Sequence, residues 1–159
     1  MGVLISDMFK HLDRDAMFNQ FNRSGKPYDI YFNKLEYIYN SRAALEVSEF
    51  ARDKGVYDQV HNLIFSAYFH DGKNIGDPEV LYDITDKVGL NREETAEIIK
   101  KKTYGNRLVA AMEEGREHGI SAVPTFIFSD NQTLTGAQPL EMFKRILAGG
   151  TSQSPGNIL

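Results

Sequence analysis

The sequence predicts a mostly α-helical protein that carries one small β-hairpin near its carboxyl end. Through most of residues 13–118, apolar side chains recur every three or four positions, which is the spacing of one face of a helix. After Gly119 this spacing ends, and a run rich in β-branched and aromatic residues follows. Of the 159 residues, 42% are hydrophobic and 25% are charged, which is the composition of an ordinary globular domain.

Helix start and stop signals divide the helical part into segments. Ser41, Asp77 and Asn91 each precede an amphipathic stretch and suit the N-cap position, where a side-chain oxygen accepts a backbone N–H. Pro78 suits the first helical position because it has no N–H to satisfy. Glycines follow several of the segments and end them. The expected helices cover residues 13–24, 41–54 and 57–70, then Pro78 to Val88, a segment after Asn91, and residues 104–118.

Two aromatic-rich segments interrupt or accompany these helices. Residues 31–39 follow a loop that begins at Lys26-Pro27-Tyr28, and their spacing is too irregular to predict a helix or a strand. The aromatic residues within 57–70 lie at helical spacing instead, which favours a place in the core over an aromatic ligand-binding box.

The hairpin is expected after the helical part. Residues 120–128 form its first strand and 133–135 its second, and the polar turn 129–132 joins them. Pro139 then begins a last helix, and residues 151–159 are expected to be a flexible tail. An isolated two-stranded hairpin is barely stable in water, so its apolar faces need helices or more strands, and the sequence predicts no further strand.

Charge and hydropathy exclude several classes of partner. A net charge of −4 and an isoelectric point near 5.6 argue against nucleic acid, whose binding needs a basic face. The one basic run, Lys100–Lys102, stands near a helix end, where positive charge suits the helix dipole. No apolar stretch is long enough to span a bilayer, and Met1–Lys10 does not resemble a secretory signal. We therefore expect no membrane partner and a cytoplasmic location.

The chain contains no cysteine, which excludes disulfides, thiolate metal sites and cysteine nucleophiles. No two of the four histidines lie three or four residues apart, so no helical metal motif forms, and we expect neither a metal nor a cofactor. Phosphate-binding glycine loops and the serine nucleophile motif are missing as well. The histidines are His11, His61, His70 and His118.

One segment carries a specific resemblance. Residues 121–126, Ser-Ala-Val-Pro-Thr-Phe, resemble the cis-proline loop of the thioredoxin superfamily. Residues 135–139, Thr-Gly-Ala-Gln-Pro, resemble the DsbA-like branch that the FrnE proteins typify. The resemblance covers roughly residues 5–148 and includes the segments 39–45, 67–81 and 88–90.

The resemblance implies a partial thioredoxin-like α/β fold with a large helical insertion. Residues 1–118 would be the helical insertion, residues 119–150 the strand–strand–helix half of the fold, and residues 151–159 the tail. Family members begin with a strand and a Cys-x-x-Cys motif at a helix N-terminus, and this chain has neither motif nor cysteine. The resemblance therefore implies a truncated form of the family fold.

The resemblance also implies a mechanism and a site. In the family, a thiolate at a helix N-terminus attacks a substrate disulfide, and a second cysteine resolves the mixed disulfide. The loop beside that cysteine presents backbone groups to an extended polypeptide, and here Ala122, Val123 and Pro124 would fill its place, with a cis Val123–Pro124 bond. No residue is expected to be catalytic.

Three functions remain open on this basis. The first is a redox-inactive piece of a DsbA-family oxidoreductase, and the second is a non-catalytic binding or assembly protein that uses the half-fold. The third is a relative of the 2-hydroxychromene-2-carboxylate isomerases or kappa-class glutathione transferases, although Gly136-Ala137-Gln138 favours the FrnE branch. We expect a homodimer through the incomplete sheet, unless residues 31–39 fold over it within one chain.

Overall fold

The computed structural model describes residues 2–150, so the expected tail lies outside the described residues. The chain divides into two compact units, Met1–Leu108 and Val109–Leu159, which we call unit 1 and unit 2. The division falls inside one helix, earlier than the boundary after residue 118 that the sequence predicted. No helix among the described residues is long and apolar enough to cross a membrane.

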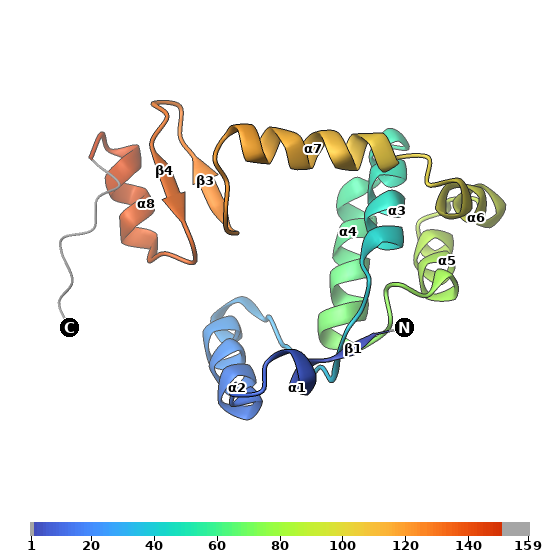
Figure 1. Cartoon of the computed structure of the whole chain (residues 1–159), viewed down its shortest axis with the longest axis horizontal. Helices are drawn as coiled ribbons and strands as arrows, with labels where there is room; N and C mark the ends of the chain where they lie inside the picture. Colours follow the sequence, from blue (N-terminus) through green and yellow to red (C-terminus); the bar gives the residue numbers. More distant parts are fainter. Residues whose placement is uncertain (1, 151–159) are drawn as a thin grey trace. The chain divides into compact units, whose positions relative to one another are not determined.

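Unit 1 is helical, with one two-stranded sheet (Figure 1). Its elements are β1 (Val3–Leu4), α1 (Ile5–Met8), α2 (Arg14–Gly25), the 3-10 turn η1 (Lys26–Tyr28), β2 (Tyr37–Ile38), α3 (Arg42–Asp53), α4 (Tyr57–Phe65), the π-helical turn η2 (Ser66–His70), α5 (Pro78–Lys87), α6 (Arg92–Lys101) and the start of α7 (Gly105–Glu117).

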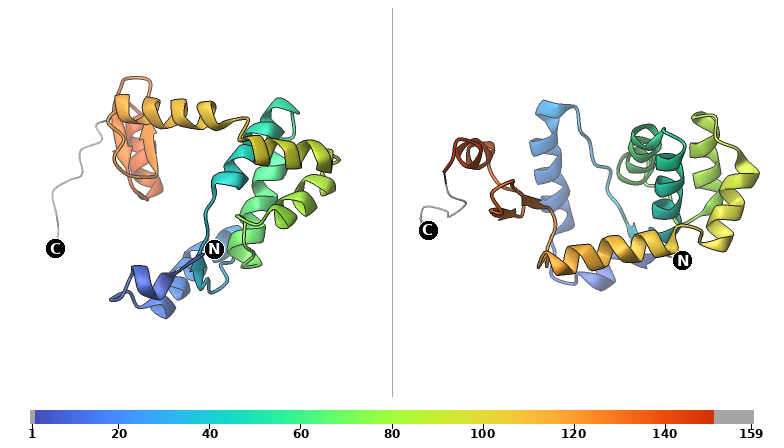
Figure 2. Two further views of the ribbon diagram at one scale, coloured as in Figure 1. Left: turned by 45° about the vertical axis from the view of Figure 1, so that its right-hand side comes forward. Right: turned by 90° about the horizontal axis from the view of Figure 1, so that it is seen from above.

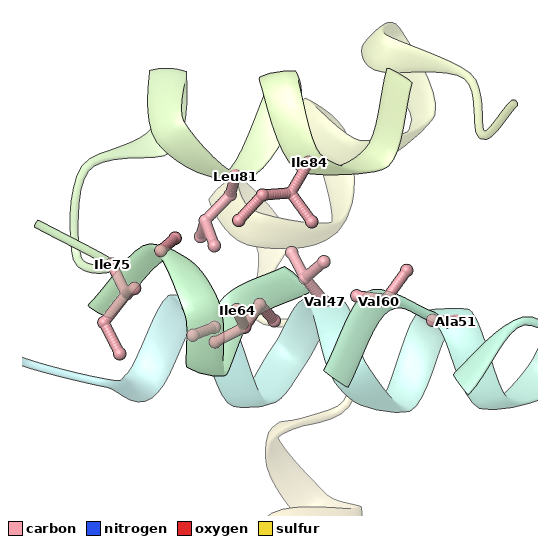
Figure 3. Packing of buried hydrophobic residues seen from close by; sticks show 9 residues of the cluster. Val47, Ala51, Val60, Ile64, Ile75, Leu81 and Ile84 are labelled. Carbon is pink, nitrogen blue, oxygen red and sulfur yellow. The ribbon is translucent and has the colours of Figure 1, made fainter. Parts of the chain in front are cut away.

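The main core of unit 1 lies among α3, α4 and α5 (Figure 3). Val47 of α3, Val60 of α4 and Leu81 of α5 have no exposed surface, and Ile84 and Ile64 pack beside them. These residues repeat at helical spacing along their own helices, so each helix offers one apolar stripe to the others. A smaller cluster holds the amino-terminal segment, and its buried members are Ile5, Phe18 and Leu35.

The helix starts follow the predicted capping chemistry, with one exception. Asp77 accepts a hydrogen bond from the backbone N–H of Glu79 at 3.1 Å, and Asn91 accepts from Glu94 at 2.7 Å. Ser41, predicted to cap α3, makes no side-chain capping bond. The neighbouring Asn40 instead accepts from the N–H at position 42, at 2.8 Å.

The prediction of no strand beyond the hairpin is wrong. In unit 1, Val3 pairs with Ile38 and Leu4 with Tyr37, in antiparallel register. Strands of two residues are too short to show the alternation of apolar and polar side chains that predicts a strand. The two strands also lie far apart in the sequence, so no hairpin signal marks their pairing. Part of the irregular segment 31–39 therefore belongs to a sheet, and its partner is β1.

The boundaries of two predicted segments also differ. The expected helix 57–70 is α-helical only to Phe65 and continues as a π-helical turn over Ser66–His70. In that turn the N–H at position 71 reaches the carbonyl of Ser66, five residues back, at 3.0 Å. The tripeptide Lys26-Pro27-Tyr28, predicted to begin a loop, forms a 3-10 turn directly after α2.

Unit 2 contains the rest of α7, the hairpin of β3 (Thr125–Ile127) and β4 (Thr133–Thr135), and α8 (Leu140–Leu147). Figure 2 shows the hairpin and α8 together from two further sides. Phe126 lies opposite Leu134 across the ladder, and its ring meets Phe143 of α8 edge-on at 4.8 Å. Leu134 and Ile146 are buried, so one face of the hairpin packs on α8.

The first strand of the hairpin is shorter than predicted. Residues 120–124 lie outside the ladder, and the N–H of Ile120 turns back to the carbonyl of Gly115 at 2.9 Å. The Val123–Pro124 peptide bond is cis in the structure. The prediction of a mostly helical fold with a small hairpin is confirmed. The main feature that the sequence did not predict is the two-stranded sheet of unit 1.

Candidate functional site

The three residues predicted to bind substrate form an exposed loop that leads into β3. Ala122 and Pro124 are exposed, and 86% of the Val123 side chain is open to solvent. The Thr125 hydroxyl donates to the carbonyl of Ala122 at 2.7 Å, and the N–H of Gly136 donates to the carbonyl of Pro124 at 2.7 Å. The loop is thus held by its flanks and leaves the Val123 side chain available for contact.

Gly136 holds the far side of this loop. Its φ of 84° lies in the left-handed region, which side chains with a Cβ rarely adopt. This conformation follows directly on β4 and accompanies the bond from Gly136 to Pro124. The backbone conformation at position 136 therefore explains why a glycine stands in the segment Thr-Gly-Ala-Gln-Pro.

The backbone groups of β3 point in alternate directions. Pro124 and Phe128, at the two ends of the strand, each make a backbone bond to the β4 side, at 2.7 and 2.9 Å. Because bonding direction alternates along an antiparallel strand, the N–H and C=O of Phe126 also face β4, and those of Thr125 and Ile127 face away. No other strand in the described part of the chain pairs with this outer edge of β3.

The loop has binding groups but no nucleophile of the kind that the family uses. The sequence contains no cysteine, and the hydroxyl of Thr125, which follows the loop, donates to the carbonyl of Ala122 and lies 3.3 Å from the hydroxyl of Thr135. Within residues 2–150, no group of three or more His, Cys, Asp or Glu side chains could hold a metal ion. The arrangement supports contact with another chain, and that role stays a prediction.

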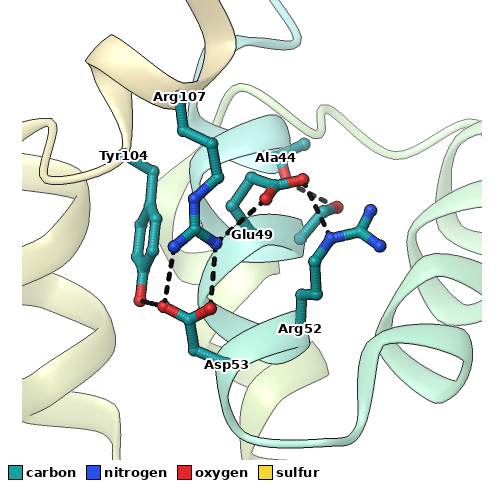
Figure 4. A network of polar contacts seen from close by, with 7 residues as sticks. Ala44, Glu49, Arg52, Asp53, Tyr104 and Arg107 are labelled. Carbon is teal, nitrogen blue, oxygen red and sulfur yellow. Dashed lines mark hydrogen bonds and ion pairs between the residues drawn. The ribbon is translucent and has the colours of Figure 1, made fainter. Parts of the chain in front are cut away.

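Sequence reasoning missed a polar cluster in unit 1 (Figure 4). Arg107 of α7 binds both oxygens of the Asp53 carboxylate, at 2.9 and 3.2 Å, and reaches Glu49 at 3.2 Å. The hydroxyl of Tyr104 donates to the same Asp53 carboxylate at 2.9 Å. The partners lie more than fifty positions apart in the sequence, so no local pattern could have found them.

The pKa shifts in this cluster indicate that its charged groups hold α7 against α3. Hydrogen bonds from Arg107, and then from Tyr104, hold the pKa of Asp53 below its usual range. Burial, followed by the hydrogen bond to Asp53, raises the pKa of Tyr104 to about 12. The bonds to Asp53 and Glu49 raise the pKa of Arg107 further, so each group keeps its ordinary charge at neutral pH.

A buried carboxylate completes the attachment of α7 to α3. Glu46 is only 1% exposed, and it accepts the backbone N–H of Tyr104 at 2.7 Å and the Arg42 guanidinium at 3.3 Å. The negative charge thus lies where α7 begins, and it satisfies an N–H that the helix cannot. Each carboxylate of this region has a structural partner, so we assign the cluster to stability.

Aromatic residues line a cleft of unit 1 that is about 620 Å³ in volume. Beside it, the ring of Phe69 contacts Phe32 and Phe65, with centroid distances of 5.6 and 5.5 Å. Phe65 is 50% exposed, so its predicted place in the core is wrong. Phe65 is the last residue of α4, and the buried residues Val60 and Ile64 mark the face of that helix that meets the core, so Phe65 lies off this face.

Comparison with known proteins decides the family. Residues 10–148 match the family model of the DSBA-like thioredoxin domain. The chain belongs to this family. The predicted FrnE-like branch is compatible with the match and stays a prediction.

Two relatives place this DSBA-like chain among known proteins. It is 28% identical to the uncharacterized protein YwbO of Bacillus subtilis over 106 residues, which are 66% of this chain and 52% of YwbO. The chain thus spans about half the length of this relative. It is also similar to the crystal structure of a probable DsbA oxidoreductase, SCO1869 from Streptomyces coelicolor, with a TM-score of 0.82. That match has 17% identity and covers 100% of this chain and 72% of the other, and it supports the fold alone.

Proposed function

We propose that this DSBA-like chain does not catalyse thiol–disulfide exchange by itself and that it acts by binding polypeptide. The single observation that carries the first part is the absence of cysteine from all 159 residues. Exchange proceeds by attack of a thiolate on a disulfide sulfur, through a mixed disulfide. A chain without sulfur nucleophiles cannot form that intermediate.

The binding role belongs to the loop of Ala122, Val123 and Pro124. All three residues are exposed, and the loop continues into a strand whose outer N–H and C=O groups have no strand partner within residues 2–150. An extended polypeptide can add to such an edge through backbone hydrogen bonds, with side-chain contacts supplying preference. The exposed Val123 side chain is the first apolar contact that such a segment would meet.

Insulin reduction tests the redox part of the proposal. The purified chain is mixed with insulin and dithiothreitol, and precipitation of the reduced B chain is followed against a sample without protein. The expected rates are equal. A rate that rises with the concentration of the chain, in protein free of contaminating thioredoxin, would refute redox inactivity.

Fluorescence anisotropy tests the binding part. The probe is a fluorescein-labelled insulin B chain that has been reduced and carboxymethylated, so that it is extended and cannot exchange disulfides. We expect saturable binding, weakened by Val123→Asp and unchanged by Leu45→Asp, an exposed position on α3. Absence of binding up to the solubility limit of the protein, or equal loss in both variants, would contradict this role.

A further inference from the structure

The outer edge of β3 combines backbone groups that no strand within residues 2–150 pairs with and apolar side chains that are exposed. The outward N–H and C=O groups of Thr125 and Ile127 alternate with the inward groups that bond β4. Phe126 remains 40% exposed although its ring touches Phe143, and Ile127 is 45% exposed on the opposite face of the hairpin. An exposed strand edge of this kind is a template for another strand.

We propose that β3 pairs with β3 of a second copy of this chain, antiparallel, about a two-fold axis that passes beside Phe126. In this register Thr125 of one copy lies opposite Ile127 of the other, and each such pair exchanges two backbone hydrogen bonds. Four hydrogen bonds form in total. The two hairpins become one four-stranded sheet, in the order β4–β3–β3–β4.

The edge is complementary to itself in this register. A two-fold axis requires the same groups on both sides, and an antiparallel strand centred on one residue meets that requirement. Proline usually deprives a strand edge of a donor, but the position of Pro124 faces β4, so the outer edge loses no N–H to it. The strand with the cis proline can therefore still offer all the groups that the pairing needs.

The side chains support the same register. The two copies of Phe126 would be a non-hydrogen-bonded pair, in which Cβ atoms approach to about 5 Å. Both rings lie on the face that α8 covers, so each would gain the other as an apolar neighbour beside Phe143. On the opposite face, Ile127 of one copy would cover the methyl group of Thr125 of the other.

The outer edge of β4 does not suit a second copy equally well. Its outward positions are Thr133 and Thr135, whose side chains are polar and exposed, and the apolar Leu134 between them is already 5% exposed and packed on α8. Gln132, at the start of this strand, also bonds the carbonyl of Gly150 at 3.0 Å. Pairing would therefore bury more apolar side-chain surface at the edge of β3 than at the edge of β4.

This inference goes beyond the proposed function. It is independent of the proposed redox inactivity, but it uses the same outer edge of β3 as the proposed polypeptide binding. Redox inactivity depends on the absence of cysteine, whereas self-association depends on the edge of β3. A dimer that binds the labelled insulin B chain less well as its own concentration rises would indicate that both occupants use the same edge.

Light scattering coupled to gel filtration tests the dimer on the full chain. The chain has a mass of 18.0 kDa, and we expect a value that approaches twice this mass as concentration rises through the micromolar range. Ile127→Pro removes an outward N–H without breaking a bond to β4, and we expect it to give a monomer. Thr133→Pro is the matched control, because it removes an outward N–H from β4, and we expect it to remain dimeric.

Circular dichroism of both proline variants checks that they keep the helical signal of the parent chain. A mass of 18.0 kDa at every accessible concentration would overturn the proposal. So would growth beyond two chains, which means an open assembly, or equal loss of the dimer in both variants.

Disulfide trapping provides a second test that does not depend on proline. Because the chain has no cysteine, Phe126→Cys introduces a single thiol. Across the proposed axis its Cα would lie about 4.5 Å from its copy, which is within the range that a disulfide spans. Phe128→Cys is the control, since it also replaces a ring that touches Phe143 but lies two positions from the axis.

Under mild oxidation we expect a covalent dimer from Phe126→Cys and little from Phe128→Cys. Equal trapping of the two variants, or trapping only of Phe128→Cys, would overturn the register.

Discussion

At the scale of single residues, the clearest electrostatic feature is the carboxylate of Asp53. Arg107 and Tyr104 bond it, and these hydrogen bonds lower its pKa in the folded chain. A group whose folded pKa is depressed stabilises the fold above its unfolded pKa, which is about 4 for aspartate. That contribution is lost as the pH falls through the folded value.

We expect Asp53→Asn to make the unfolding free energy less dependent on pH below about 4, where the parent chain loses this contribution. Urea unfolding at a series of pH values between neutral and acid measures it. The control is Asp58→Asn on α4, for which the described residues supply no ion-pair partner. A parallel pH dependence in Asp53→Asn and the parent chain would show that the cluster adds no acid-sensitive stability. Asp15 and Glu97 also have lowered pKa values, caused by Lys34 and Lys101, so part of the slope should persist in the variant.

At the scale of elements, the sequence predicted well those features that depend on hydrogen bonds between residues close together in the chain. Asp77 and Asn91 cap their helices as expected, because a capping side chain and the N–H that it accepts lie two or three residues apart. The β1–β2 pairing and the bond from Arg107 to Asp53 join residues separated by tens of positions, and no local pattern carries them. The loop at Val123 was found only through resemblance, since its residues alone describe an ordinary strand entry.

The packing of α3, α4 and α5 makes a sharp prediction at the same scale. Leu81 has no exposed surface and lies in the main core of unit 1, so Leu81→Ala should lower the unfolding free energy by about 2–5 kcal/mol. Leu45→Ala is the matched control, because Leu45 of α3 is 48% exposed, and it should change stability by less than about 1 kcal/mol. Urea unfolding measures both, and similar losses in the two variants would contradict the assignment of this core.

At the scale of the whole molecule, the two compact units differ in how much apolar surface they bury. Unit 1 has a core built from three helices and a second cluster around Phe18. In the described part of unit 2, the buried apolar residues are Leu134 and Ile146. The DSBA-like family match spans both units, and the loop of Ala122, Val123 and Pro124, for which we propose binding, lies in unit 2, where fewer apolar residues are buried.

Residue-resolved hydrogen exchange should reveal this difference. Exchange from a folded region follows the free energy of its local opening, which rises with the apolar surface that opening exposes. We therefore expect the slowest amides around Val47, Val60 and Leu81, and faster exchange at Phe126, whose N–H bonds β4. Equal protection of the two units would contradict the separation into units of unequal stability.

The concentration dependence of exchange then separates the stability of unit 2 from its self-association. If β3 pairs with a second copy, the outward amides of Thr125 and Ile127 gain acceptors, so raising the protein concentration should slow their exchange. The outward amides of Thr133 and Thr135 on β4 gain no acceptor and report only the general stabilisation of the hairpin. Selective slowing on β3 would therefore be the signature of edge pairing, whereas equal slowing on both strands would indicate a dimer formed through another surface. Amides of α3 to α5 serve as the reference, because these helices belong to unit 1 and the β3 edge to unit 2.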